Sequence, residues 1–220
     1  IQPNSSTVVV DLEPEADDIL ANFKQRTRRS IRKAEKSGVV VEVVEPNEVN
    51  LKKFYKLYSL TGERAGFFIR PLSYYLSFWQ IFSSNKMASL YFAKTGSGIV
   101  AAALVLHSSS KALYKDGASD RSIMPEGAPY LLQWEIMKDL KMRGIKEYDL
   151  HGTPPQDKLD DKSHPFYSLG LFKTAFSNKV TSVVGAYDII VNDRKYKLWQ
   201  KFGLRAYQAW AHRIKNSTFY

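Results

Sequence analysis

Lys173 stands among aromatic residues in the segment 170–177, with Phe172 directly before it and Phe176 three residues after it. The aliphatic stem of such a lysine can pack against its neighbours while the ammonium group is aimed at a cleft. A cation fixed in this way can stabilise negative charge on a reacting oxygen. The same spacing also fits an amphipathic helix on which Lys173 is solvated. Phe172 and Lys173 are therefore candidate catalytic residues, and the alternative is that they belong to an ordinary surface helix.

A run of basic residues between positions 24 and 36 holds seven Lys and Arg residues against one acid, Glu35. Steps of three and four residues from Arg26 reach Arg29 and Lys33, so these three share one helical ridge. The nearly uniform sign favours a phosphate-bearing partner whose binding depends strongly on salt. The alternative is a solvated helix face. The candidate nucleic-acid or phosphate-binding residues are Arg26, Arg28, Arg29, Arg32 and Lys33.

Arg70 precedes Pro71 at the expected entrance of a helix, and Tyr74 lies four positions later. A cation and a phenol on one helix face can bind the same anionic group. In the alternative, Tyr74 packs with Phe78 and Trp79 in the core. Arg70 and Tyr74 are therefore candidate substrate-binding residues.

The chemistry that the sequence lacks narrows its function. It has no cysteine, no phosphate-binding glycine loop, no dinucleotide-binding glycine motif and no nucleophile elbow. The one grouping that could hold a metal, His151 and His164 with Asp160 or Asp161, has no standard ligand spacing. We therefore expect no metal and no cofactor. Catalysis would rest on positioning and electrostatics rather than on a covalent intermediate.

The 220 residues are 44% hydrophobic and 25% charged, which is typical of a globular protein with a sizeable core. The net charge of +10 favours nucleic acid, nucleotide-linked substrates or an anionic membrane surface. No apolar run is long enough to span a bilayer. We expect a cytoplasmic protein with at most peripheral contact with the inner membrane face near Trp199, Phe202 and Trp210, which we expect to lie mainly in helix core.

Hydrophobic periodicity and turn residues predict alternating strands and helices. The first part of the chain is predicted to hold a strand at 7–12, a helix at 13–37, a strand at 39–44, helices at 48–64 and 72–82, and strands at 90–94, 99–107 and 112–118. The short turns between the last three strands predict an antiparallel meander, with Tyr114 near the end of the third strand. A helix at 128–143, a strand at 147–152, a loop at 153–165, a strand around Tyr187 and a helix at 196–214 follow. This order predicts a mixed α/β fold with a largely antiparallel sheet flanked by helices.

Several of these segments, taken in order, resemble the FemABX family. Its members are non-ribosomal peptidyltransferases of the peptidoglycan cross-bridge with acetyltransferase-like (GNAT) folds. The resemblance covers most of the chain and is carried by residues 1–12, 24–39, 70–75, 114–119, 170–173 and 187–188. It implies a GNAT-like fold for this chain.

The resemblance also implies an activity. An aminoacyl group would pass from aminoacyl-tRNA to the stem-peptide side-chain amine of a UDP-linked or lipid-linked muropeptide. Phe172 and Lys173 would lie at the aminoacyl ester, Arg70 and Tyr74 on the phosphate and sugar side of the precursor, and Tyr114 in the cleft. An amine that attacks an ester needs no protein nucleophile, and one oxyanion donor lowers the barrier by about 3 kcal/mol.

Family members carry two GNAT-like halves. By this comparison residues 1–38 resemble the end of a first half, and residues 39–220 resemble a second GNAT-like domain with a C-terminal helix. Because the chain lacks an initiating Met, we expect a fragment of a longer parent or a shortened homologue. Two alternatives stay open. One is an acyl-CoA-dependent GNAT-type acyltransferase, for which residues 121–127 form a poor pyrophosphate cradle; the other is a catalytically silent basic RNA-binding module.

Overall fold

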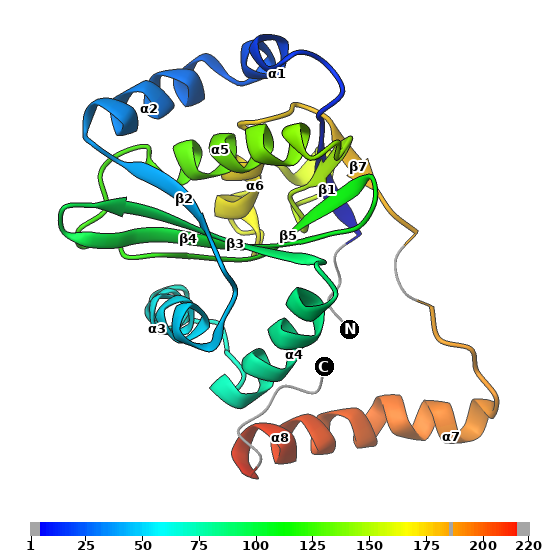
Figure 1. The fold of residues 1–220 in the computed structure, drawn as a ribbon. Helices are drawn as coiled ribbons and strands as arrows, with labels where there is room; N and C mark the ends of the chain where they lie inside the picture. The colour runs from blue at the N-terminus through cyan, green and yellow to red at the C-terminus, as the bar shows by residue number, and fades with distance from the viewer. Residues whose placement is uncertain (1–4, 185–186, 215–220) are drawn as a thin grey trace.

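A computed structural model describes residues 5–184 and 187–214 of the chain. It has three layers, with a seven-stranded sheet between two sets of helices (Figure 1). In spatial order the strands are β2 (Val40–Val44), β3 (Ala88–Thr95), β4 (Gly98–His107), β5 (Lys111–Ser119), β6 (Glu147–Asp149), β1 (Ser6–Asp11) and β7 (Val180–Ser182). Neighbouring strands are antiparallel except for β5 and β6, which are parallel. The predicted mixed, largely antiparallel α/β fold and its meander are confirmed.

Helices cover both faces of the sheet (Figure 1). One face carries α1 (Ala16–Asn22), α2 (Gln25–Lys36), α5 (Ala128–Met142) and α6 (Tyr167–Lys173), and the other carries α3 (Glu48–Ala65) and α4 (Leu72–Ser84). A short 3₁₀ turn, η1 (Gln156–Lys158), lies in the predicted loop at 153–165. The C-terminal segments are α7 (Asp193–Leu198), a π-helical turn η2 (Trp199–Gly203) and α8 (Leu204–Ile214).

The central strands supply side chains to two hydrophobic cores. On β3, Tyr91 and Ala93 pack on the side of α5, whereas Leu90 and Phe92 pack on the side of α3 and α4. Successive side chains of a strand point to opposite faces, so a strand buried on both faces is apolar throughout. Each large side chain buried in this way contributes about 1.5–3 kcal/mol. Trp79 is fully buried at the centre of the second core.

The predicted single helix after the first strand is wrong. The structure has two helices, α1 and α2, because Phe23 and Lys24 adopt extended backbone conformations with ψ of 150° and 142°. The Phe23 ring turns into the core and meets Trp134 and Phe176 edge to face, at centroid distances of 5.5 and 5.1 Å. Burial of this ring therefore sets the place where the helix breaks.

The predicted strand around Tyr187 is also wrong. The strand β7 ends at Ser182, and Tyr187 has no regular structure and is 79% exposed. Gly185 and Ala186 lie outside the described residues. A run of β-branched residues favours a strand only where a partner strand is available, and none pairs with residues 187–191 in the described part of the chain.

We call residues 187–214 the C-terminal arm. Its helical part begins at Asp193 rather than at Tyr196, and Figure 1 shows it apart from the sheet. The expectation that its aromatic residues lie in a helix core is wrong, because Trp199, Phe202 and Trp210 are 41%, 57% and 39% exposed. Among the described helices, none is long and apolar enough to cross a membrane.

The predicted domain boundary at residue 38 falls at a turn. Gly38 has φ of 75°, a left-handed conformation that suits glycine, and it links α2 to β2. The elements on both sides of this turn share one sheet and one core. The assignment of residues 1–38 to a different half stays a prediction.

Helix α2 packs directly on the start of α5. Gly127 precedes α5 with φ of 90°, and a Cβ placed on it would lie 2.0 Å from the backbone oxygen of Ser30 in α2. An alanine at position 127 would therefore combine a strained backbone with a clash against another backbone. Gly127 is the residue that lets the two helices approach.

We expect Gly127→Ala to lower the free energy of unfolding by about 3 kcal/mol, because the left-handed conformation costs about 1–2 kcal/mol and overpacking adds a similar amount. Gly144→Ala is the matched control. Gly144 has φ of 80° but nothing within 4 Å of its Cβ position, so it carries only the first cost. Denaturant unfolding measures both. Equal losses would contradict the packing of α2 on Gly127.

Candidate active site

The sheet opens between β5 and β6. These parallel strands pair only along Lys111–Leu113 and Glu147–Asp149. Beyond this point β5 continues to Ser119 without β6 beside it, so the two strands no longer share ladder hydrogen bonds. We call this place the strand split, with residues 114–119 on its β5 side and residues 150–152 on its β6 side.

Lys173 ends α6 and places its ammonium group at the strand split. Its side chain is 6% exposed, and Nζ donates hydrogen bonds to the backbone oxygens of His151 at 2.8 Å and Gly152 at 2.7 Å. Helix α6 approaches closely because a Cβ on Gly170 would lie 2.7 Å from Cδ of Pro154. The alternative of a solvated Lys173 is wrong, although Lys173 does lie on a helix.

Burial lowers the pKa of Lys173 to about 8, and the negative charge of Asp149 acts against this fall. The ammonium form therefore predominates at pH 7. An ammonium group has three donors, and two of them bind the carbonyls described above. The third can donate to an oxygen of a substrate. The site thus presents a preorganised cation in a poorly solvated place.

Phe172 supports the position of α6. Its half-buried ring lies 5.1 Å from the ring of Tyr130 on α5 and 5.4 Å from that of Phe176. These contacts fix the end of α6 against α5 and thereby hold Lys173 at the strand split. Contact of Phe172 with an aminoacyl ester stays a prediction.

Strand β5 carries a bulge at Lys115, which has no partner residue in the ladder with β4. A bulge breaks the alternation of side chains. Tyr114 therefore packs on the side of α5, whereas Asp116 faces α3, where its Oδ1 accepts hydrogen bonds from Tyr58 Oη at 3.1 Å and from Lys115 Nζ at 3.4 Å. Asp116 is 8% exposed, and its Oδ2 has no hydrogen-bond partner among the described residues.

Tyr114 is on the β5 side of the strand split, where it packs against the core on the side of α5, and its place in a substrate cleft stays a prediction. Its phenol lies over Gly117, where a Cβ would be 1.6 Å from Oη. Burial, together with the charge of Asp116, raises the pKa of Tyr114, and a hydrogen bond with Gln133 acts in the opposite sense. Tyr114 is therefore a neutral phenol at physiological pH.

Arg70 and Tyr74 come together as predicted. The guanidinium carbon of Arg70 lies 4.5 Å from the centroid of the Tyr74 ring, a cation–π contact. The alternative packing is right in part, because Tyr74 stacks on Phe78 with an interplanar angle of 11°, yet Tyr74 is 42% exposed while Trp79 is buried. The ammonium group of Lys115 lies 5.8 Å from the Phe78 centroid. A continuous series of contacts therefore links Arg70 to the bulge of β5.

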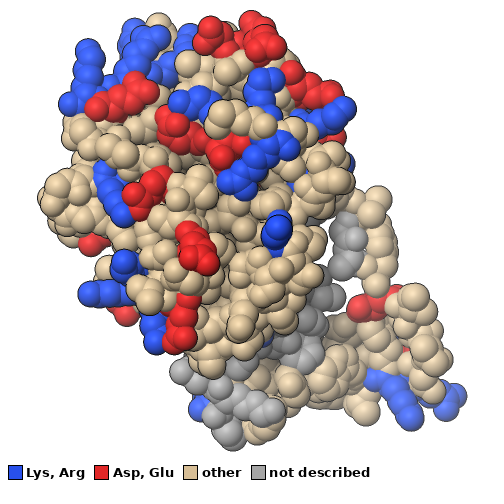
Figure 2. Space-filling view, viewed as in Figure 1, with Lys and Arg blue, Asp and Glu red and all other residues tan. Residues whose placement is uncertain are grey.

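Helix α2 exposes most of the predicted basic ridge. Arg26, Arg29, Arg32 and Lys33 are exposed, and Figure 2 shows basic side chains at the upper left, where α2 lies in Figure 1. Lys33 forms an ion pair with Glu126. Binding of phosphate by these residues stays a prediction.

Two basic residues of the segment 24–36, Lys24 and Arg28, bind other groups of the protein. Arg28 differs from the ridge because it is half-buried and its Nη1 donates to the backbone oxygens of Ala21, at 2.8 Å, and Phe23. Its guanidinium group closes the last turn of α1. Lys24, before α2, donates to Thr174 Oγ1 at 3.3 Å. The residue directly before α2 is therefore bonded to the residue directly after Lys173.

His151 also lies at the strand split, and the sequence alone indicated for it only a possible metal ligand. Its backbone has φ of 62°, and its N–H donates to Asp149 Oδ1 at 2.7 Å. Burial, and then the cation of Lys173, lowers the pKa of His151. The one signal for it in the sequence is that two polar residues, Asp149 and His151, lie at the end of a strand and two positions further on. No three His, Asp or Glu side chains gather into a metal site among the described residues, so the grouping of His151 with His164 has no geometric support.

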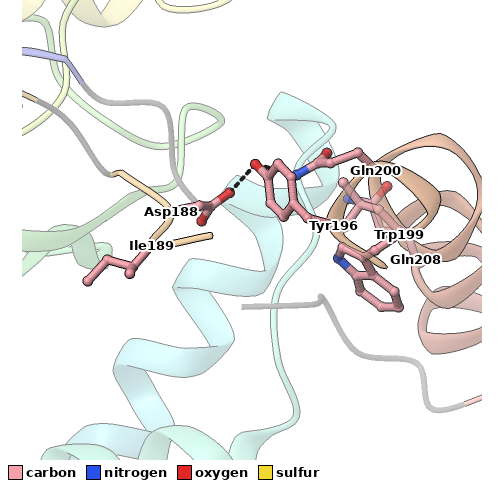
Figure 3. Close-up of a pocket in the computed structure, with 7 residues that line it drawn as sticks. Asp188, Ile189, Tyr196, Trp199, Gln200 and Gln208 are labelled. Atoms are coloured by element: carbon pink, nitrogen blue, oxygen red, sulfur yellow. Dashed lines mark hydrogen bonds between the residues drawn. The ribbon is translucent and has the colours of Figure 1, made fainter. Parts of the chain in front are cut away.

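A hollow of about 450 Å³ lies within the C-terminal arm (Figure 3). Asp188 lies on one side, and its Oδ2 accepts a hydrogen bond of 2.6 Å from Tyr196 Oη, which in turn accepts one of 3.0 Å from Gln200 Nε2. None of the predicted site residues lines this hollow. Its one carboxylate is already bound, so the strand split is the better candidate for a reaction.

A FemAB family model matches residues 1–98 and 89–202 of the chain. The chain belongs to the FemAB family. Among curated relatives, it is 24% identical to the lipid II:glycine glycyltransferase of Staphylococcus haemolyticus, in an alignment that covers 90% of the chain and 61% of that relative. The chain thus spans about three fifths of the length of the curated relatives it matches. The predicted family is confirmed.

Solved structures show the same fold. The crystal structure of FemX matches with a TM-score of 0.78 and 22% identity, over 90% of this FemAB chain and 64% of FemX. An aminoglycoside acetyltransferase from an uncultured soil metagenomic sample matches with a TM-score of 0.50 and 19% identity, over 71% of this chain and 99% of the acetyltransferase. The predicted GNAT-like fold of this FemAB member is therefore confirmed.

The lowered pKa of Lys173 predicts a pH dependence of stability. Between pH 8 and 10.5 the unfolded chain binds a proton at this residue that the folded chain has released, so stability rises with pH in this range. Relative to Lys173→Met, the free energy of unfolding of the wild type should rise by on the order of 3 kcal/mol across it. Denaturant unfolding at several pH values tests this. A constant difference between the two proteins would show that the pKa is not lowered.

Proposed function

We propose that this chain transfers an aminoacyl group from aminoacyl-tRNA to the side-chain amine of the stem peptide in a peptidoglycan precursor. The observation that carries the proposal is the buried ammonium group of Lys173, held at the strand split by the backbone oxygens of His151 and Gly152. The names of the curated relatives, lipid II:glycine glycyltransferases, favour a lipid-linked precursor as the acceptor.

The reaction fits this chemistry. When an amine attacks an ester, negative charge develops on the carbonyl oxygen and then on the leaving ribose oxygen. A cation aimed at this position before the reaction stabilises the charge without reorganisation, and one such donor contributes about 3 kcal/mol. Lys173 has one donor left for this purpose after its two carbonyl contacts. We assign to Lys173 the role of stabilising this charge.

The other residues receive roles from their positions. Arg70, stacked on the partly exposed Tyr74, offers a cation and a phenol to the phosphate and sugar of the precursor. Tyr114 would line the path between that contact and Lys173. The exposed ridge of Arg26, Arg29 and neighbouring residues would bind phosphates of the tRNA. Peripheral contact with a membrane surface would bring a lipid-linked acceptor to the site.

The acyl-CoA alternative has less support. A pyrophosphate would need open N–H groups at the start of α5. The backbone oxygen of Ser30 lies against Gly127 at this helix start, and its partial negative charge disfavours an anion there. A titration with coenzyme A that shows no binding would agree with this view.

We expect Lys173→Met to lower the rate of aminoacyl transfer by about 10²-fold, because it removes one stabilising donor and keeps a side chain of similar length. The assay follows transfer from charged tRNA to a lipid-linked or UDP-linked muropeptide. Lys179→Met, an exposed lysine six residues on, is the matched control and should transfer at the wild-type rate. Wild-type transfer by Lys173→Met would exclude the assigned role. Absence of transfer by the wild type, with tRNA still bound, would favour an RNA-binding module.

The basic ridge predicts a salt dependence of tRNA binding. Replacing Arg29 and Arg32 by glutamine removes two exposed cations of α2, so the slope of log K against log salt should become shallower by about 1.5. The matched control replaces Lys53 and Lys56, two exposed lysines of α3 on the other face of the sheet, and should leave the slope as it is. Equal effects of the two double variants would mean that binding is not localised to α2.

A further inference from the structure

His151 is a half-buried titratable residue at the strand split to which no step of the proposed reaction has been given. We propose that the His151 imidazole accepts the proton that the acceptor amine loses when it attacks the aminoacyl ester. This assignment rests on the proposed function, because it names the base of that same reaction. It makes His151 a catalytic residue on the acceptor side, opposite in role to the cation of Lys173.

The position of His151 supports contact with the reacting groups. Its backbone oxygen accepts one of the two hydrogen bonds that hold the Lys173 ammonium group. A ligand oxygen bound to Lys173 would therefore lie close to the backbone of His151. Lys173 and His151 are thus fixed relative to each other by a direct bond rather than through a flexible loop.

Charged groups from both sides of the strand split act on the His151 ring. Asp149 ends β6 and Lys173 ends α6, whereas Lys115 and Asp116 belong to the bulge of β5. The two carboxylates favour its charged form and the two ammonium groups disfavour it. Burial and the two ammonium groups lower the pKa of His151, so the ring is neutral at pH 7 and able to accept a proton, while Asp149 and Asp116 act in the opposite sense and favour the protonated form.

The backbone of His151 is held in an uncommon conformation. A φ of 62° is left-handed, which costs a residue with a Cβ roughly 1 kcal/mol or more. Non-glycine residues with such angles concentrate at functional sites, where the surroundings hold them in place. Here the N–H of His151 is held by Asp149 and its backbone oxygen by Lys173. Both neighbours therefore fix the direction in which the imidazole leaves the chain.

The acceptor arrives as an ammonium ion with a pKa of about 10.4 and loses its first proton to water. The free amine forms a C–N bond with the ester carbon, and the electron pair of the carbonyl moves to the oxygen stabilised by Lys173. The second proton passes from nitrogen to His151. When the carbonyl re-forms and the C–O bond breaks, the imidazolium returns this proton to the ribose oxygen. An amide and a free hydroxyl result, and His151 is neutral again.

Glycine and asparagine are the substitutions that test this role, because both accept a left-handed backbone. We expect His151→Gly and His151→Asn to lower kcat for the amine acceptor by about 10²-fold or more, which is the usual contribution of a general base. Added imidazole should restore part of the activity of His151→Gly. Hydroxylamine, a strong nucleophile that is largely unprotonated at pH 7, should react with the aminoacyl ester at nearly the wild-type rate in both variants.

His164→Asn is the matched control. The Nδ1 atom of His164 accepts a hydrogen bond of 3.0 Å from the backbone N–H of Phe166, and an asparagine oxygen can take its place. This variant should transfer to the amine at the wild-type rate. Near wild-type kcat in His151→Gly, or loss of the amine reaction without any rescue by imidazole, would overturn the assignment. Failure of the wild type with both nucleophiles would instead contradict the proposed function.

A second measurement does not require turnover. In protein labelled at histidine, the imidazole signal of His151 is identified by its loss in His151→Asn. A synthetic peptide with a lysine side-chain amine is then titrated in. A shift of the His151 signal with unchanged His164 supports contact with the acceptor, and an unchanged His151 signal at peptide concentrations that shift other resonances overturns it.

Discussion

The burial of one ammonium group against two backbone oxygens is the contact on which the rest of the site depends. Removing a cation from water is costly unless hydrogen bonds replace its hydration, and here the residues directly after β6 supply them. Those backbone oxygens are free to do so because β6 has already left β5. The end of α6 must also reach this point, which the missing side chain of Gly170 permits. The strand split, the close approach of α6 and the burial of the cation therefore support one another.

The candidate site draws its residues from both faces of the sheet. The face of α5 and α6 holds the aromatic contacts of Phe172 and the phenol of Tyr114. The opposite face carries the stacked pair of Arg70 and Tyr74 at the start of α4. The strand split is where groups from both faces approach one another, since no ladder closes it. A substrate with a phosphate at one end and a reacting amine at the other would extend from one face toward the other.

Much of the fold followed from local pattern, and the failures have definite physical causes. The meander of β3 to β5 was predictable because short turns allow only antiparallel neighbours. The break before α2 was not, because Phe23 and Lys24 are compatible with a helix and leave it for contacts with residues 134 and 176 that are distant in sequence. The run at 187–191 has strand-forming residues without a partner strand. Local propensity describes what a segment can adopt, and tertiary contacts decide between the options.

The candidate site was predictable in its residues more than in its geometry. Lys173 became a candidate through its sequence context and Tyr114 through the family resemblance, whereas Asp116 did not, because a regular strand would turn it to the same side as Tyr114. The spacing of residues 170–177 predicts a helix, and Lys173 does lie on one. A helical spacing does not show whether the lysine faces solvent or is buried, so the burial of Lys173 could not be predicted. His151 was visible only as a polar residue after a strand. Its left-handed backbone and its place beside Lys173 depend on the departure of β6 from β5.

The bulge of β5 has an evolutionary consequence. With Lys115 outside the ladder, Tyr114 and Gly117 share one face of β5, and Asp116 and Ala118 share the other. This is the arrangement that the strand would have if Lys115 were deleted and the alternation were regular. A relative with a regular strand here would thus align with a gap of a single residue opposite Lys115. The extra residue therefore adds a charged side chain to the strand while its neighbours keep the faces that a regular strand would give them.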